Sequence, residues 1–187
     1  MRVGIAGYGV VGKTRHRSIE SNTSYKVTAI SESNQEARQS IAPGLEAYND
    51  YQSLIANAEI DVIFISLPNQ FAAEATCLSL QKGLHVFCEK PPARTHAELL
   101  EVEKKSLQFP ALKLMYGFNH RFHLSVEKAK ALIKSDSIGR IINMKGVYGK
   151  SQMISFNQTD WRTNREASGG GILLDQGIHM LDLMRYL

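Results

Sequence analysis

Short apolar runs alternate with helix-like segments along the first two-thirds of the chain. The runs that we expect to form strands cover residues 2–6, 25–30, 61–66, 84–88 and 112–117. The segments that we expect to form helices begin after residue 12 and then cover residues 34–42, 50–57, 71–82 and 95–108. Unbroken apolar runs are typical of parallel strands buried on both faces, so the alternation predicts a doubly wound α/β domain.

The pattern changes near residue 118, where we place a boundary between domains at residues 1–118 and 119–187. The second domain has a predicted helix, strand, polar loop and amphipathic helix, at residues 124–134, 140–148, 150–170 and 171–187. Ile142, Met144 and Tyr148 would share one face of the strand by its period of two. Because a stable sheet normally needs three or more strands, we expect this domain to be incomplete.

Three glycines follow the first apolar run in the pattern Gly7-x-Gly9-x-x-Gly12. In a dinucleotide-binding loop the first glycine allows a tight turn, the second lets the backbone approach a pyrophosphate, and the third lets the helix pack close to the strand. The N-terminus of the following helix is itself an anion site, because its N–H groups are unpaired and its dipole is positive there. An ordinary glycine-rich turn is the alternative. The loop residues assigned to the cofactor site are Gly7, Tyr8, Gly9, Val10, Val11 and Gly12.

Glu32 supports the dinucleotide interpretation. It ends the second apolar run and lies twenty positions after Gly12, where a carboxylate is expected to accept hydrogen bonds from the adenosine ribose. A carboxylate there repels a 2′-phosphate, and the next residue is Ser33 rather than an arginine that could pair with one. The sequence therefore favours NAD over NADP as the cofactor. We interpret the nearby Lys13, Arg15 and Arg17 as a solvated basic face of the first helix.

Composition and charge mainly exclude classes of function. The net charge of +4 comes from interleaved acidic and basic residues, which does not predict a nucleic-acid or membrane surface. No segment approaches the roughly 18 apolar residues of a membrane span, and no signal peptide is predicted. Cys77 and Cys88 lack metal-type spacing, so we expect no metal site, two small buried side chains and a reducing, cytoplasmic compartment.

Glu89, Lys90, Pro91 and Pro92 directly follow a predicted strand. Ligands of open α/β sheets bind outside the carboxyl ends of the strands, which would place Lys90 at the mouth of the cofactor crevice. The proline that follows biases Lys90 toward extended torsions and so limits where its side chain leaves the backbone. A solvated loop lysine is the alternative.

Asp175 and His179 follow three consecutive glycines near the end of the chain. Residues four apart share one face of a helix, so both side chains could address one small molecule. A histidine suits proton transfer from a hydroxyl because its unperturbed pKa is about 6.5. The alternative is an intrahelical Asp–His pair on a helix surface.

Two further polar segments carry neutral and cationic donors suited to sugar hydroxyls or a charged substituent. One is residues 117–122, with Asn119 and Arg121, and the other is residues 160–162, with Trp161 and Arg162. Packing at the junction between the two domains would explain them equally well.

Taken together, these motifs resemble the glucose-fructose oxidoreductase, inositol dehydrogenase and rhizopine catabolism family (Gfo/Idh/MocA). The match covers nearly the whole chain. It rests on the glycine loop, Ser66-Leu67-Pro68-Asn69, the segment from Gly83 to Pro91, Asn119-x-Arg121, and the segment from Gly169 to His179. The resemblance implies a Rossmann domain followed by an α/β domain with a large, mostly antiparallel sheet. It also implies hydride transfer between nicotinamide and a hydroxyl-bearing carbon of a sugar, nucleotide sugar or cyclitol.

The resemblance also implies residue roles. Lys90 would hydrogen-bond the reacting hydroxyl, His179 would exchange its proton, and Asp175 would position substrate and imidazole. Glu89 would help to orient Lys90. The cofactor site would extend to Ser66, Leu67, Pro68, Asn69, Glu89 and Lys90, and the substrate pocket to Asn119, Arg121, Trp161 and Arg162.

Two departures from the family pattern keep alternatives open. Phe71-Ala72-Ala73 stands where many members have a histidine, so we expect that a contact near the nicotinamide is missing. Members also run to well over three hundred residues, and the absent sheet often forms the subunit interface, so a homo-oligomer is expected if the second domain is completed. A dinucleotide sensor without catalysis and an inactive shortened member are the competing functions.

Overall fold

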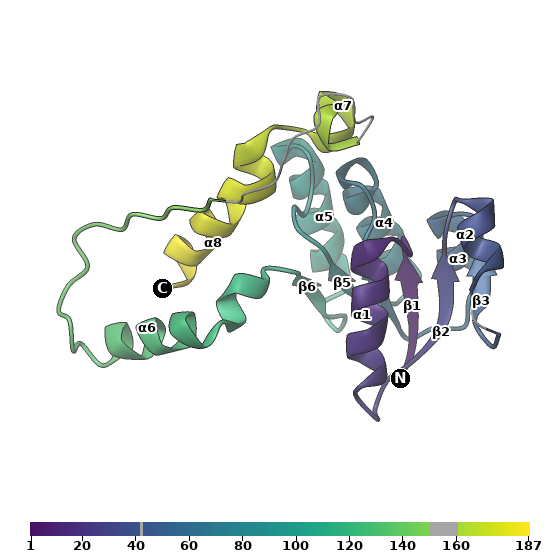
Figure 1. The fold of residues 1–187 in the computed structure, drawn as a ribbon, viewed down its shortest axis with the longest axis horizontal. Helices are drawn as coiled ribbons and strands as arrows, with labels where there is room; N and C mark the ends of the chain where they lie inside the picture. Colours follow the sequence, from purple (N-terminus) through teal and green to yellow (C-terminus); the bar gives the residue numbers. More distant parts are fainter. Residues whose placement is uncertain (42, 150–160) are drawn as a thin grey trace. The chain divides into compact units, whose positions relative to one another are not determined.

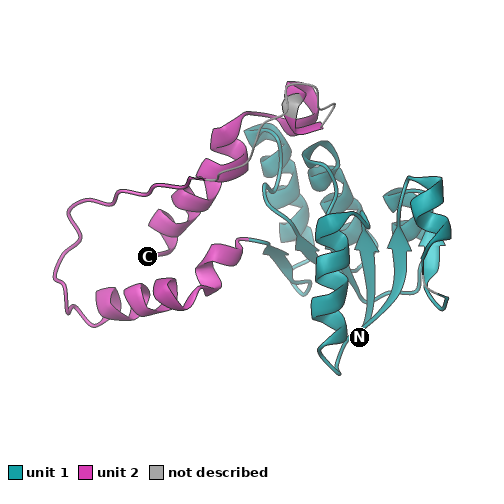
Figure 2. Cartoon of the chain, viewed as in Figure 1, with its two compact units in different colours: residues 1–117 teal, residues 118–187 magenta. Residues whose placement is uncertain are grey.

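The computed structural model describes residues 1–41, 43–149 and 161–187. The chain divides into two compact units, unit 1 (Met1–Gly117) and unit 2 (Phe118–Leu187), which Figure 2 shows in different colours.

Six parallel strands of unit 1 form one sheet in the order β3-β2-β1-β4-β5-β6 (Figure 1). The strands are β1 (Arg2–Ala6), β2 (Lys26–Ser31), β3 (Glu46–Tyr48), β4 (Val62–Ile65), β5 (His85–Cys88) and β6 (Leu114–Tyr116). The order runs outward in both directions from the β1/β4 pair, which makes that pair the switch point where ligands of such sheets bind. The predicted doubly wound parallel sheet is confirmed.

One strand was missed by the sequence prediction. β3 is three residues long, lies at the sheet edge beside β2 and includes the exposed Glu46. It has no apolar run, because a short edge strand is held by its backbone hydrogen bonds to β2 and is not buried on both faces.

All the helices predicted in unit 1 are present, although two of them begin earlier than expected, at residues 10 and 69. They are α1 (Val10–Glu20), α2 (Gln35–Gln39), α3 (Tyr51–Asn57), α4 (Asn69–Gln81) and α5 (His96–Gln108). The Thr95 hydroxyl accepts the Glu98 N–H at 3.2 Å and caps α5. Gly83 has φ +85° just after α4, the left-handed torsion that ends many helices. The helix predicted over residues 34–42 is shorter than expected, and residue 42 lies outside the described residues.

Alternate residues of the central strands are buried on opposite faces of the sheet. On β1, Val3 and Ile5 pack with Ile19 of α1 on one face. Ile63 and Ile65 of β4 lie on the other face, in the cluster that includes residues of α3 and α4. Burial on both faces is the reason that these strands show unbroken apolar runs instead of alternation.

All regular structure in the described residues of unit 2 is helical. Its elements are η1 (Asn119–Phe122), α6 (Leu124–Lys134), η2 (Trp161–Thr163), α7 (Arg165–Ser168), the π-helical η3 (Leu173–Gly177) and α8 (Ile178–Tyr186). The predicted helix over residues 124–134 is confirmed at both ends.

The strand predicted over residues 140–148 is wrong, because residues 141–149 have no regular structure. Ile142 is 90% exposed, so the predicted shared face is not buried either. An extended segment becomes a strand only when a neighbour pairs with its N–H and C=O groups, and the described part of unit 2 offers no other strand. The predicted antiparallel sheet is likewise not formed by the described residues.

Neither cysteine lies in a metal cluster of the described residues. Cys88 is buried and Cys77 is half-buried, and burial raises the pKa of the Cys88 thiol to about 12. Within the described ranges, no helix has both the length and the apolar character that a membrane span requires.

Candidate functional site

Gly7 turns the chain at the carboxyl end of β1. Its φ of +87° is a torsion that residues with a Cβ rarely adopt, and a Cβ there would lie 2.6 Å from the carbonyl oxygen of Ser66. Its N–H donates to the carbonyl and hydroxyl oxygens of Ser31 at 3.2 and 3.3 Å. The turn is therefore held between the ends of β2 and β4, at the switch point of the sheet.

The other two glycines differ in what surrounds them. A Cβ on Gly12 would lie 2.1 Å from the carbonyl oxygen of Gly7, whereas a Cβ on Gly9 would meet no atom within 4 Å. Gly12 thus permits close packing of α1 on the loop, and Gly9 faces open space. Because Gly9 is the N-cap of α1 and gives no side-chain cap, a pyrophosphate could approach the first N–H groups of the helix there.

The remaining loop residues surround this open side. Val10 and Val11 are 85% and 41% exposed. Tyr8 is half-buried, and its hydroxyl lies 2.5 Å from Nδ1 of His16. This contact is within α1 and its preceding loop, so it fixes the ring of Tyr8 beside the glycine turn.

Glu32 follows β2 as expected, and its side chain is half-buried. Its Oε1 accepts the N–H of Asn34 at 2.9 Å, and its backbone carbonyl accepts a hydrogen bond from Nη1 of Arg38 at 2.6 Å. An arginine therefore does reach this position, six residues along the chain, although Ser33 is the sequence neighbour. Arg38 lies on the short α2, and no pattern in the sequence indicates its contact with the Glu32 loop.

The segment Ser66-Leu67-Pro68-Asn69 connects β4 to α4. The N–H of Ser66 donates to the carbonyl of Ala6 at 2.7 Å, which brings the segment beside the glycine turn. Asn69 is buried at the start of α4. The Ser66 hydroxyl is buried without a hydrogen-bond partner among the described residues. An orphaned hydroxyl beside the turn fits a site that a polar ligand completes.

Glu89 and Lys90 follow β5, at the same edge of the sheet. The N–H of Glu89 donates to the carbonyl of Ile65 at 2.9 Å, so the ladder with β4 extends to this residue. Both side chains are half-buried, and the Lys90–Pro91 peptide bond is cis. The four segments that carry the predicted cofactor residues thus all leave the carboxyl ends of strands, namely β1, β2, β4 and β5.

The other predicted catalytic residues belong to unit 2, whereas Lys90 belongs to unit 1. Asp175 lies in η3 and His179 in α8, so the expected single helix has a π-helical first turn. His179 is 5% exposed, and its ring stacks on that of His120 with centroids 4.2 Å apart. His120 was in a segment that the sequence singled out, but the sequence did not indicate its contact with His179.

The predicted substrate residues lie in two short helices of unit 2. Asn119 and Arg121 are in η1, and Arg121 forms a two-bond ion pair with Asp182, one bond being 2.8 Å from Nε to Oδ2. Hydrogen bonding to Asp182 raises the pKa of Arg121. Trp161 and Arg162 are in η2, where the guanidinium lies 4.6 Å from the ring centroid. Asp160, also singled out in the sequence, is outside the described residues.

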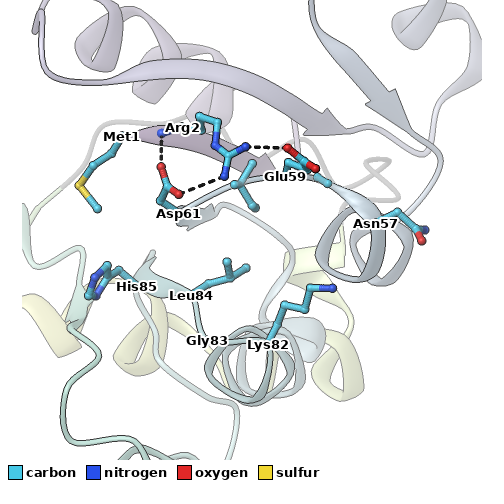
Figure 3. A pocket seen from close by; sticks show the side chains of 11 residues that line it. Met1, Arg2, Asn57, Glu59, Asp61, Lys82, Gly83, Leu84 and His85 are labelled. Carbon is cyan, nitrogen blue, oxygen red and sulfur yellow. Dashed lines mark hydrogen bonds and ion pairs between the residues drawn. The ribbon is translucent and has the colours of Figure 1, made fainter.

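A cavity of about 720 Å³ lies elsewhere, at the amino ends of β1, β4 and β5 (Figure 3). Its wall holds an ion network in which Nη1 of Arg2 lies 2.8 Å from Glu59 and Nη2 lies 3.3 Å from Asp61. A hydrogen bond from the backbone N–H of Arg2 lowers the pKa of Asp61. None of the site residues predicted from the sequence lines this cavity. Arg2, Glu59 and Asp61 pair with one another, and Nζ of Lys82 donates to the carbonyl of Ala56 at 2.7 Å.

Comparison with known proteins agrees with the geometry at the carboxyl ends of the strands. Residues 1–107 match a family described as "Oxidoreductase family, NAD-binding Rossmann fold". The chain belongs to the Gfo/Idh/MocA family. Residues 126–187 match the C-terminal domain of the same family.

Relatives within the Gfo/Idh/MocA family include dehydrogenases of sugars and of a cyclitol. The chain is 31% identical to D-glucoside 3-dehydrogenase of Escherichia coli and 30% identical to levoglucosan dehydrogenase of Pseudarthrobacter phenanthrenivorans. Each comparison covers 100% of this chain but only 54% and 51% of the relative. The crystal structure of myo-inositol 2-dehydrogenase from Lactobacillus plantarum matches with a TM-score of 0.86 and 31% identity, over 100% of this chain and 56% of that one. The chain thus spans about half the length of these proteins.

Proposed function

We propose that this chain carries the NAD-binding domain and part of the substrate domain of an oxidoreductase. The reaction transfers a hydride between nicotinamide and a hydroxyl-bearing carbon of a sugar, nucleotide sugar or cyclitol. The domains are residues 1–118 and 119–187, and we expect a homo-oligomer where the second domain is complete. The observation that supports the proposal is that the glycine turn, Glu32 and Lys90 follow β1, β2 and β5, at the carboxyl edge of the sheet where ligands of such folds bind.

The residues present fit a dinucleotide. Gly9 opens onto space at the uncapped N-terminus of α1, where the pyrophosphate would lie, and the buried hydroxyl of Ser66 stands next to the turn. The residues that would hold the cofactor are Gly7, Tyr8, Gly9, Val10, Val11, Gly12, Glu32, Ser66, Leu67, Pro68, Asn69, Glu89 and Lys90. When bound, the nicotinamide would supply the hydride acceptor.

Three side chains carry out the acid–base chemistry in this proposal. In the oxidation direction Lys90 donates a hydrogen bond to the reacting hydroxyl oxygen, and His179 takes the hydroxyl proton as the carbonyl forms. Asp175 positions the substrate and the imidazole. The carbon loses its hydrogen as hydride and the oxygen loses its proton to His179, so a secondary alcohol becomes a ketone and a cyclic hemiacetal becomes a lactone. The presence of Lys90, Asp175 and His179 favours this function over a non-catalytic sensor.

The cofactor is NAD rather than NADP in this proposal. One oxygen of Glu32 accepts the N–H of Asn34, which directs the carboxylate back over its own loop at the end of β2. A second acceptor oxygen suits the 2′-hydroxyl of an adenosine ribose, while its charge repels a 2′-phosphate. Arg38 softens this preference, since its guanidinium lies on the Glu32 carbonyl.

We also expect four residues of unit 2 to contact the substrate: Asn119, Arg121, Trp161 and Arg162. Arg121 also has a structural role, because its pair with Asp182 joins η1 to α8. We therefore expect its guanidinium to fix η1 against α8 as well as to contact substrate.

Formation of NADH by the protein tests this function. We expect turnover of NAD with at least one member of a panel of cyclitols and glucosides, and slower turnover with NADP at equal concentration. Matched reactions without the polyol give the background rate. An absence of polyol-dependent NADH formation across the panel, from a protein that binds NAD, would contradict the catalytic part of the proposal.

A further inference from the structure

Arg15 lies on α1 one turn after Gly12, and its side chain faces the end of β5. Nε donates to Oε1 of Glu89 at 2.7 Å, and Nη2 lies 2.5 Å from the same oxygen. The side chains of Arg15 and Glu89 are only 28% and 18% exposed. The expected solvated basic face is therefore wrong for this residue, whose charge is paired and partly withdrawn from water. Charge-assisted hydrogen bonds in such places are stronger than neutral ones.

Both members of the pair have further contacts that fix their positions. The guanidinium of Arg15 lies 5.0 Å from the ring centroid of Phe87, and Phe87 stacks on Phe64 with centroids 4.8 Å apart. The second oxygen of Glu89 lies against Gly117, where a Cβ would come within 2.8 Å of it. Rotation of either side chain would lose these contacts, which therefore favour the observed geometry of the ion pair.

The backbone beside this pair is part of the sheet. The N–H of Glu89 donates to the carbonyl of Ile65 at 2.9 Å, and the N–H of Gly117 donates to the carbonyl of Cys88 at 2.8 Å. Lys90 is the first residue of the loop after these two backbone hydrogen bonds. The pair with Arg15 is thus the link between the helix that begins at the glycine turn and the loop that carries Lys90.

We propose that Arg15 is a positioning residue that, through Glu89, ties the cofactor helix α1 to residues 89–94 and couples dinucleotide binding to the placement of Lys90. The inference rests on the proposed function, because it takes α1 as the cofactor helix and Lys90 as a catalytic residue. A ligand at the N-terminus of α1 fixes that helix, and the pair passes this constraint to the loop. A lysine would not replace Arg15, since an ammonium group has neither the planar fork nor the stacking face.

Hydrogen exchange measured by mass spectrometry tests this link without requiring turnover. The variants are Arg15→Gln and Glu89→Gln, and the matched control is Arg17→Gln, which removes an exposed charge from the same helix. In the absence of NAD, we expect exchange of residues 89–94 to be about tenfold faster in the first two variants, because local opening no longer breaks a charge-assisted bond. Peptides of β1 and β2 should be unchanged, and Arg17→Gln should match the wild type.

The same measurement with NAD present distinguishes coupling between NAD binding and residues 89–94 from simple support of the fold by Arg15. NAD should slow exchange of residues 89–94 in the wild type and in Arg17→Gln. In Arg15→Gln it should slow exchange at the glycine turn as in the wild type but slow exchange of residues 89–94 less than in the wild type, because only direct contacts with NAD remain there, with little change in the NAD dissociation constant. Loss of structural support alone would not separate these two regions. If Arg15→Gln does not fold, Arg15→Lys keeps the charge without the fork and should show the same separation.

Two results would overturn the inference. One is unchanged exchange of residues 89–94 in Arg15→Gln and Glu89→Gln, and the other is equal acceleration in every peptide of unit 1. If the wild type bound no NAD, the proposed cofactor site would fail, while the comparison without NAD would still decide whether Arg15 holds the loop.

Discussion

Alanine at Gly12 is expected to abolish the stabilisation of the protein by NAD and to lower its unfolding midpoint. The new Cβ would lie 2.1 Å from the carbonyl oxygen of Gly7, and a backbone atom of a fixed turn cannot move aside as a side chain can. The N-terminus of α1 must therefore shift away from β1. Overpacking of this kind costs about 1–3 kcal/mol of stability, and it also displaces the N–H groups that would bind pyrophosphate.

Gly9→Ala separates these two effects. A Cβ on Gly9 would meet no protein atom within 4 Å, and its φ of −74° suits any residue. We expect the unfolding midpoint to stay near that of the wild type while NAD no longer raises it, because the methyl group occupies the space for the pyrophosphate. Gly171→Ala, also without a neighbour within 4 Å, is the control that should change neither quantity. Full NAD stabilisation of Gly12→Ala would show that the cofactor does not use this turn.

Replacement of Lys90 by methionine or of His179 by asparagine should lower the rate of NADH formation by about 10²–10⁴-fold. Each variant removes one partner of the reacting hydroxyl, and neither side chain is required at the N-terminus of α1. The rise of the unfolding midpoint with NAD should therefore be retained. The measurements are the steady-state rate with the best polyol and the thermal midpoint with and without NAD.

Matched substitutions of other lysine and histidine residues distinguish the loss of a catalytic group from a general loss of activity. Lys82→Met removes a lysine that lines the cavity at the amino ends of the strands and donates to the carbonyl of Ala56. His96→Asn removes an exposed histidine at the start of α5. Both should retain the wild-type rate. If Lys90→Met and His179→Asn were as active as these controls, the assigned roles would be wrong.

The parallel sheet could be predicted from the sequence because its central strands are buried on both faces. Val3 and Ile5 pack on one side of β1 while Ala6 packs on the other, so the apolar run is unbroken and visible. β3 lies at an edge and has no such run. The segment at residues 140–148 fails for the opposite reason, since its apolar residues indicate a strand but strand formation depends on a neighbouring chain segment.

The positions of the glycine turn and Glu32 could be predicted from the sequence, because each directly follows a strand that its apolar run reveals. Arg15 and Arg38 could not. Arg15 pairs with Glu89 across 74 positions, and Arg38 reaches the Glu32 loop only because α2 begins where it does. Such contacts depend on where α1 lies over the sheet and on the length of a short helix, neither of which has a local signature.

The most direct test of the central claim is the thermal unfolding of the 187-residue chain alone, with NAD and with NADP. A ligand that binds only the folded state stabilises it by about 2.7 kcal/mol at a hundredfold excess over its dissociation constant. We predict one cooperative transition of unit 1 that NAD raises more than NADP does, with this preference lost in Glu32→Gln. A cooperative transition that neither dinucleotide shifts would contradict the assignment of the glycine turn as a cofactor site.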